Sequence, residues 1–499
     1  MTLSADPWAR YPPQWPINDD NISNYNQQND QTCNNDNAIS CEEQYPSSEQ
    51  AHAFLPLLPL SIRYTANFLM QAMPLNILPS TYEATLALSA VIINMVAFVI
   101  AAISLFDLTI SILKIDASEE KKSNTSECTG DDSEASHHSL AMITAQLFCI
   151  NPAGVFFTTA YSESIFAMLT FTGHAIIARG QYYQCCLQNR IIQDPDGQKD
   201  HGSSLCWWSN LYWIPPTQLF MIASYARSNG TFSSIWLAIV GIARCCSCVT
   251  MNQSSIKCLS VLLFHGILAS LVAYPVHYHD QRGYKFHCLD TIQRPSWCHH
   301  VGTGRTFSLY AYVQRKHWNV GLFRYYEMKQ VPNFILALPV LALSFVATTS
   351  WIRRSWSRHK DCASGSNEGE SSGSVMTKQP FRWAFLALSA SSDDFLPHCR
   401  HQEKEGNSST MDNMNLPMLL LGRKFLSYYA IFAGFAFIGA FLAHVQISTR
   451  LICSSCPAFY WFASALAIGS GNNGMVLYSY FALYNILGVI MHVNWLPWT

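Results

Sequence analysis

One stretch of this sequence decides the fold class: Ala84-Thr-Leu-Ala-Leu-Ser-Ala-Val-Ile-Ile-Asn-Met-Val-Ala-Phe-Val-Ile-Ala-Ala-Ile-Ser-Leu-Phe-Asp-Leu-Thr-Ile-Ser-Ile-Leu113. Asp107 is its only ionisable side chain. A helix needs about 20 mainly apolar residues to cross a hydrocarbon core of about 30 Å, because each residue adds about 1.5 Å of rise. The stretch therefore predicts a membrane-spanning helix.

Similar apolar runs recur along the chain. The clearest others cover residues 140–160, 162–178, 258–276, 333–351, 425–445 and 474–492. Weaker runs, interrupted by proline or arginine, cover residues 54–73, 210–226, 234–251 and 459–469. Lipid forces backbone groups to bond within helices, and no alternating barrel pattern is present. We therefore predict an all-α polytopic membrane protein with about nine to eleven transmembrane helices.

The composition supports this class and excludes others. Hydrophobic residues make up 49% of the chain and charged residues 12%, against roughly 25% charged residues in an average soluble domain. The net charge is −2, and lysines and arginines are scattered among acids. Without a basic stripe to bind phosphate backbones, nucleic acid is not an expected partner, whereas membrane lipid is.

Polar stretches precede and interrupt the apolar part of the chain. Residues 1–52 form an Asn/Asp-rich tract, and residues 53–499 form the multi-spanning domain. Inserts near residues 114–138, 184–204 and 354–422 have the composition of disordered segments.

The 17 cysteines lack the spacing of a disulfide scaffold. Cys453-Ser-Ser-Cys456 has CxxC spacing but no second pair to complete a zinc site, so we interpret it as structural or as a local disulfide. The sequence thus predicts no metal site and no cofactor, and leaves metal dependence open.

Ionisable side chains at membrane depth cost about 2.5–3.5 kcal/mol each on insertion scales, so polar clusters at the ends of apolar runs suggest functional sites. In the first cluster, Glu163 follows an Asn151-Pro break and is a candidate acid, with a helix cap as the alternative. The second cluster, Arg227-Ser-Asn229-Gly230, suits an anionic phosphate, although a lone arginine also snorkels to the interface.

A third, richer cluster runs from His317 to Asn333 and includes Trp318, Arg324, Tyr325, Tyr326 and Lys329. Aromatic faces stack on sugar rings, and guanidinium or ammonium groups pair with phosphate; the alternative is an interfacial belt with positive flanks. A fourth cluster, His444 to Arg450 together with the terminal residues from His492, is unspecific because helix ends favour cations.

Taken in order, these strings resemble the PIG-V family, GPI mannosyltransferase 2. The resemblance rests on Asn151-Pro-Ala, Tyr161-Ser-Glu, Arg227-Ser-Asn-Gly, Trp318-Asn-Val-Gly, Arg324-Tyr-Tyr-Glu, Lys329-Gln-Val-Pro-Asn-Phe, His444-Val-Gln with Thr449-Arg450, Tyr460-Trp-Phe and Asn494-Trp-Leu-Pro-Trp-Thr. Each string is weak by itself, and the ordered set is specific.

The resemblance implies a GT-C-type glycosyltransferase of the endoplasmic reticulum membrane. Such an enzyme transfers the second, α-1,6-linked mannose from dolichol-phosphate-mannose to the GPI (glycosylphosphatidylinositol) precursor, and the family's fungal members work with a companion membrane subunit. The family begins with a membrane helix and a lumenal loop whose Trp-Asp aspartate is the expected acid/base group. The tract up to Ser48 contains no Trp-Asp pair, so no catalytic role is transferred to its aspartates, and an inactive or N-terminally truncated paralogue is the alternative.

The implied chemistry requires a carboxylate, cations for the leaving phosphate and an apolar groove for the lipid tail. We assign donor or phosphate contacts to Arg227, Arg324 and Lys329. We assign sugar or loop-orienting contacts to Asn229, Trp318, Tyr325 and Tyr326. Glu163 is the best remaining candidate for the catalytic acid. A membrane transporter is a further alternative, although no internal repeat is evident.

Overall fold

A computed structural model describes residues 52–74, 79, 81–123, 130–193, 211–250, 253–289, 298, 308–364, 425–469, 471–494 and 496. All regular secondary structure in these ranges is helical. The chain forms two compact units, one from Met1–Ala90 with Val276–Val320 and one from Val91–Pro275 with Gly321–Thr499. The N-terminal tract up to residue 51 lies outside the described residues.

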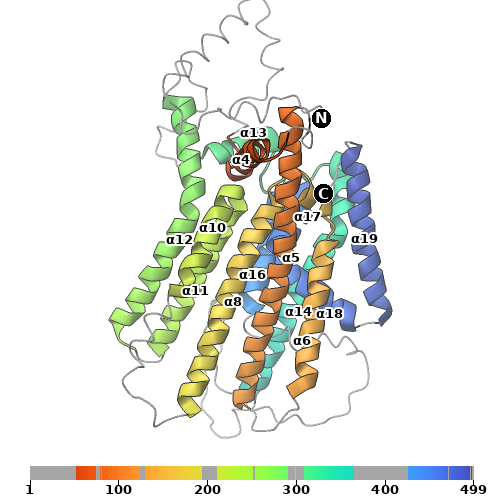
Figure 1. The fold of residues 1–499 in the computed structure, drawn as a ribbon. Helices are drawn as coiled ribbons and strands as arrows, with labels where there is room; N and C mark the ends of the chain where they lie inside the picture. The colour runs from red at the N-terminus through yellow and green to blue at the C-terminus, as the bar shows by residue number, and fades with distance from the viewer. Residues whose placement is uncertain are drawn as a thin grey trace, which may run out of the picture. The chain divides into compact units, whose positions relative to one another are not determined.

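The second unit contains most of the helices (Figure 1). Within it lie α6 (Gly130–Cys149), α7 (Gly154–Thr158), α8 (Glu163–Gln193), α10 (Ile214–Ala226), α11 (Phe232–Thr250), α14 (Val331–Ser364), α16 (Leu426–Phe437), α17 (Val445–Ser455), α18 (Pro457–Gly469) and α19 (Gly471–Val493). α8 packs on α10, and α18 packs on α6 and α19. Two long helices, α5 (Tyr82–Ser123) and α12 (Ser255–Tyr284), continue across the division between the units.

The core of the second unit surrounds α18. Its residues Phe459, Tyr460, Trp461 and Phe462 are all buried, and they join a large cluster with side chains from α5, α6, α8, α14 and α16. Trp461 Nε1 donates a hydrogen bond to Thr109 Oγ1 (2.8 Å), which satisfies the polar edge of a buried ring. Such all-round burial explains why α18 is apolar on every face.

The first unit contains α4 (Leu57–Ala72) and α13 (Leu309–Trp318). A disulfide joins Cys288 to Cys298, ten residues further along the chain. Nearby, the His279 ring stacks on His52 with centroids 5.7 Å apart.

Four described helices are long and apolar enough to cross a membrane: Tyr82–Ile115, Ser255–Leu289, Met328–Arg353 and Gly474–Val493. A fifth crossing is available if Val445–Ser455 and Pro457–Ile468, which meet at 82°, form one broken span. The chain is therefore a multi-pass membrane protein, and the predicted total of nine to eleven spans remains a prediction.

Two expectations need correction. The apolar run 140–160 is not one helix, because α6 ends at Cys149 and the chain turns at Asn151-Pro152 before α7. The inserts are also shorter than expected: α5 continues to Ser123, α8 to Gln193 and α14 to Ser364. Helix-forming Glu, Lys, Gln and Arg residues extend these helices beyond their apolar parts. The central parts of the inserts lie outside the described residues.

Candidate active site

Glu163, at the start of α8, is the anion of a buried ionic cluster. Its carboxylate is completely buried, and Oε1 contacts both Arg227 Nη1 and Arg450 Nη2 at 2.5 Å. Arg450 Nε donates a further hydrogen bond to the same oxygen at 2.7 Å. These three residues, which we call the Glu163 cluster, combine two positive charges with one negative charge.

The position of Glu163 follows from the break between α6 and α7. Proline at 152 cannot continue a helix, and the Asn151 side chain closes the turn by donating to Phe148 O (2.8 Å) and accepting from Ala153 N (2.9 Å). On α19, Asn485 Nδ2 donates to Asn151 O at 3.2 Å. A Cβ on Gly154 would lie 2.2 Å from Asn485 Nδ2, so a larger residue there would displace the Asn485 side chain.

Arg227 is fixed by the turn that ends α10. Its backbone is extended, and its N–H donates to Ala223 O at 3.0 Å. Arg227 Nε donates to Asn229 Oδ1 (3.3 Å), and Asn229 Nδ2 donates to Ser455 Oγ (3.0 Å) on α17. Asn229 therefore holds Arg227 in place and ties the α10 turn to α17. A Cβ on Gly230 would lie 2.7 Å from the Ser224 backbone, so the turn packs directly on α10.

Arg450 lies midway along α17, against two aromatic rings that contact each other. Its guanidinium carbon is 4.1 Å from the Phe156 ring centroid and 4.6 Å from that of Tyr161. The His492 ring, near the end of α19, contacts the same two rings edge-on. Cation–π contacts of this kind are strongest where water is excluded, so the rings add to the attraction of Glu163.

The cluster is better suited to binding an anion than to accepting a proton. A carboxylate that two guanidiniums bond is stabilised in its charged form, which weakens it as a base. Each guanidinium carries five N–H donors, so the contacts with Glu163 and Asn229 do not exhaust either arginine. Arg227 and Arg450 are 14% and 20% exposed, and the cluster retains a net positive charge.

The remaining predicted residues of this unit lie on the segment 321–330, before α14. Arg324, Tyr326 and Lys329 are exposed, whereas Tyr325 is buried. Lys329 Nζ pairs with Glu327 Oε2 at 2.5 Å. Tyr326 Oη donates to Ala440 O at 3.0 Å.

This segment packs against the chain just before α17. Backbone N–H groups of Gly321 and Phe323 donate to Leu442 O (3.1 Å) and Phe441 O (3.0 Å). Phe323 adopts a positive φ of 56°, which is rare for a bulky residue and occurs mainly where surrounding contacts impose it.

Tyr325 anchors the segment to α14 and to His444. Its hydroxyl donates to Gln330 Oε1 and accepts from Asn333 Nδ2 (3.1 Å). Burial raises the pKa of the Tyr325 hydroxyl above its usual value, partly opposed by the bond from Asn333, so the hydroxyl stays protonated as a donor. The Tyr325 and His444 ring centroids are 3.6 Å apart.

Helix α17 connects the two groups of residues. The segment 321–330 contacts His444, the N-cap of α17, and Arg450 follows six residues later. At about 1.5 Å per residue, these positions are roughly 9 Å apart along the helix axis. One short helix thus carries contacts to both groups.

For two residues, Trp318 and Arg450, the structure differs from what the sequence predicts. Trp318 belongs to the first unit, where its ring contacts Phe54 edge-on at 5.9 Å. The sequence assigns no role to Arg450, yet both its Nη2 and its Nε bond to Glu163 Oε1.

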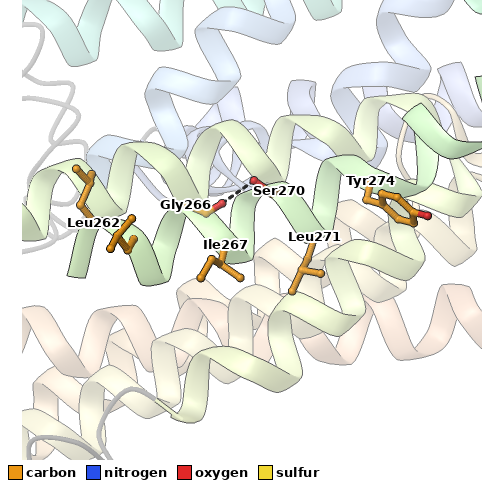
Figure 2. Close-up of a pocket in the computed structure, with 7 residues that line it drawn as sticks. Leu262, Gly266, Ile267, Ser270, Leu271 and Tyr274 are labelled. Atoms are coloured by element: carbon orange, nitrogen blue, oxygen red, sulfur yellow. Dashed lines mark hydrogen bonds between the residues drawn. The ribbon is translucent and has the colours of Figure 1, made fainter. Parts of the chain in front are cut away.

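A shallow hollow on α12 is unsuited to a phosphate (Figure 2). Leu262, Ile267, Leu271 and Tyr274 are among its lining residues, and the Ser270 hydroxyl is already bonded to Gly266 O at 2.8 Å. No acid or cation lines it. Nor is any described group of three or more His, Cys, Asp or Glu side chains arranged to hold a metal ion. Cys453 and Cys456 are buried free thiols rather than a disulfide.

The chain is similar to known mannosyltransferases along most of its length. A family model described as "Mannosyltransferase (PIG-V)" matches residues 132–499. The chain is 27% identical to GPI alpha-1,6-mannosyltransferase 2 of Cricetulus griseus, over 90% of this chain and 84% of that protein. It is 25% identical to the Homo sapiens protein of the same name, with the same coverage. GPI mannosyltransferase 2 of Drosophila pseudoobscura is 23% identical, over 90% of this chain and 82% of that protein. No solved structure matches.

Proposed function

The chain belongs to the PIG-V mannosyltransferase family, and from this premise we propose that it transfers an α-1,6-linked mannose to the GPI precursor. We propose dolichol-phosphate-mannose as the donor, the endoplasmic reticulum membrane as the location and a GT-C-type fold as the framework. The names of relatives that align over most of both chains support the acceptor and the linkage.

The observation that carries the mechanism is the pair of guanidiniums held by one buried carboxylate. Transfer of mannose from a lipid phosphate leaves negative charge on that phosphate, and preorganised donors stabilise such charge most effectively where water is excluded. Arg227 and Arg450 are fixed by Glu163, Asn229 and two aromatic rings before any substrate arrives. We assign them to the leaving dolichyl phosphate.

Glu163 then acts as a positioning residue. To serve as the catalytic acid or base, its carboxylate would have to leave both arginines and reach a sugar hydroxyl from a fully buried position. The bonds of Glu163 to both arginines therefore support a positioning role rather than a role as catalytic acid or base.

The segment 321–330 supplies the remaining contacts in this proposal. Arg324 and Lys329 contact the donor phosphate or its neighbouring sugar, and Tyr326 offers an exposed ring for stacking on a sugar. Tyr325 and Asn229 orient these loops, and the sugar contact of Trp318 stays a prediction from the sequence. A companion membrane subunit is a proposed partner.

The test is rescue of cells that lack the second GPI mannosyltransferase. The wild-type chain should restore GPI-anchored protein at the cell surface, measured by flow cytometry, while Arg227→Ala and Arg450→Ala should not, at equal amounts of membrane-inserted protein. Arg179→Ala is the matched control, because Arg179 pairs with Asp107 at the protein surface. Failure of the wild-type chain despite normal insertion would favour the inactive paralogue, and full rescue by both cluster variants would refute the phosphate assignment.

A further inference from the structure

Four free cysteines gather where α11 ends and α12 begins. Cys245, Cys246 and Cys248 lie in the last turns of α11, and Cys258 lies in the first turn of α12. The thiols of Cys245 and Cys248 lie close to that of Cys258. The three cysteines of α11 are partly exposed, whereas Cys258 is buried.

These thiols lie at the edge of an apolar region. The candidate span Ser255–Leu289 begins three residues before Cys258, and Lys257 adjoins the buried cysteine. On α11 the apolar run ends in Arg244 and the cysteines, followed within a few residues by polar Thr250 and Asn252. Cationic and polar residues at the end of an apolar helix mark the headgroup region. Cysteines in this juxtamembrane position are the usual sites of S-acylation.

The two ends of the span Ser255–Leu289 differ in the redox state of their cysteines. Cys288, at its C-terminal end, is in a disulfide with Cys298, whereas the cysteines around its N-terminal end are free. Disulfides persist in oxidising compartments, and cytosolic thiols are kept reduced. The two ends of a membrane span face opposite compartments, so the thiol group lies on the cytosolic side.

We propose that Cys245, Cys246 and Cys248 form an S-acylation site at the cytosolic membrane surface. The thiol sulfur attacks the carbonyl carbon of a long-chain fatty acyl-coenzyme A, the bond from that carbon to the coenzyme A sulfur breaks, and the thiol proton passes to the departing sulfur. A thioester replaces a thioester, and nothing is oxidised or reduced. The attached chain would anchor the polar end of α11 in the membrane, next to the exposed apolar side chains of α12.

The test is acyl exchange on the full chain in membranes from expressing cells. Free thiols are blocked with N-ethylmaleimide, thioesters are cleaved with hydroxylamine, and the released thiols are labelled with a maleimide that carries a polyethylene glycol mass tag. We expect a hydroxylamine-dependent mass shift in the wild-type chain and its complete loss in Cys245→Ser/Cys246→Ser/Cys248→Ser. Cys258→Ser, the matched control, should keep the shift.

Three outcomes would overturn the proposal: no hydroxylamine-dependent shift in the wild-type chain, an unchanged shift in the triple variant, or a shift that requires dithiothreitol instead and so reports a disulfide. In sealed microsomes, a membrane-impermeant maleimide should reach the released thiols without detergent, and a requirement for detergent would contradict the cytosolic assignment. Normal cell-surface rescue by the triple variant would show that loss of its mass shift does not reflect misfolding.

Discussion

The Glu163 cluster and the segment 321–330 each contain an ion pair at 2.5 Å, yet the two pairs differ in burial. Glu163 is fully buried and its arginines are at most 20% exposed, whereas Lys329 and Glu327 are 73% and 43% exposed. An exposed pair contributes about 0–1 kcal/mol, but removing one partner of a buried pair costs about 3–5 kcal/mol. The two ion pairs thus have equal distances but contribute differently to stability.

The difference separates fixed cations from adaptable ones. In the buried cluster, the arginines are ordered by the fold itself, so binding an anion there requires little further ordering. On the segment, Lys329 keeps much of its conformational freedom and can follow a substrate at an entropic cost. Substitutions in the two regions should therefore affect folding and transfer in different proportions.

The largest effect is expected from Glu163→Gln. The amide removes the negative charge between two guanidiniums, so we expect a loss of stability at or above about 3–5 kcal/mol. The measurement is the melting temperature of the detergent-solubilised protein. Transfer should fall mainly through a lowered kcat, because the displaced arginines no longer stabilise the charge that develops on the phosphate, and Glu163→Asp, which keeps the charge, should recover part of it. A stable Glu163→Gln protein that has lost only the acidic limb of its pH–rate profile would instead make Glu163 the base.

Arg450→Met should have the next largest effect. Methionine keeps a long apolar side chain against Phe156 and Tyr161 but leaves Glu163 with Arg227 alone. We expect a loss of roughly 10²-fold in transfer, which is the size of losing one preorganised donor to a developing negative charge. Labelled mannose transfer in microsomes measures it. Transfer within a factor of about two of wild type, well short of that loss, would remove Arg450 from the phosphate site.

Tyr325→Phe should have a smaller effect, and mainly on stability. The change removes the hydroxyl that bonds Gln330 and Asn333, for which we expect about 0.5–1.5 kcal/mol. Asn333 keeps its bond to Gln330 at 2.6 Å, so its amide loses only one of its two hydrogen-bond partners. A melting temperature equal to that of Tyr326→Phe, whose hydroxyl bonds a backbone carbonyl at the surface, would show that burial of Tyr325 adds nothing.

Lys329→Met should change stability least, by less than about 1 kcal/mol, because its pair with Glu327 is exposed. If Lys329 contacts the donor, transfer at low donor concentration should nevertheless fall. Glu327→Gln is the control, because it breaks the same ion pair while keeping the lysine. Equal transfer by Lys329→Met, Glu327→Gln and the wild-type chain would assign this pair to the surface alone.

Much of the fold follows from the sequence, because burial in lipid or protein requires long apolar helices. Every predicted apolar run is at least partly helical in the described residues. Hydropathy wrongly predicts one helix over 140–160 because it does not register a turn, although Pro152 signals one. Composition does not predict the polar helical ends of α5, α8 and α14, because it does not distinguish an exposed helix from a disordered insert.

The candidate site could be predicted only in part. Glu163 and Arg450 are 287 residues apart in sequence, and no local pattern connects them. A signal was nevertheless present: Glu163 is the only acid between residues 139 and 193, and Arg450 is the only charged residue between 425 and 494. Since isolated charges in apolar helices require partners, the sequence itself favours pairing Glu163 with Arg450.

The 82° bend between α17 and α18 gives α17 the geometry of a lever. The bend lies at Cys456, and α18 beyond it is embedded in the core. At about 1.5 Å per residue, Arg450 lies roughly 9 Å and His444 roughly 18 Å from that pivot. A small rotation of α17 about the bend would therefore displace His444, which contacts the segment 321–330, about twice as far as Arg450.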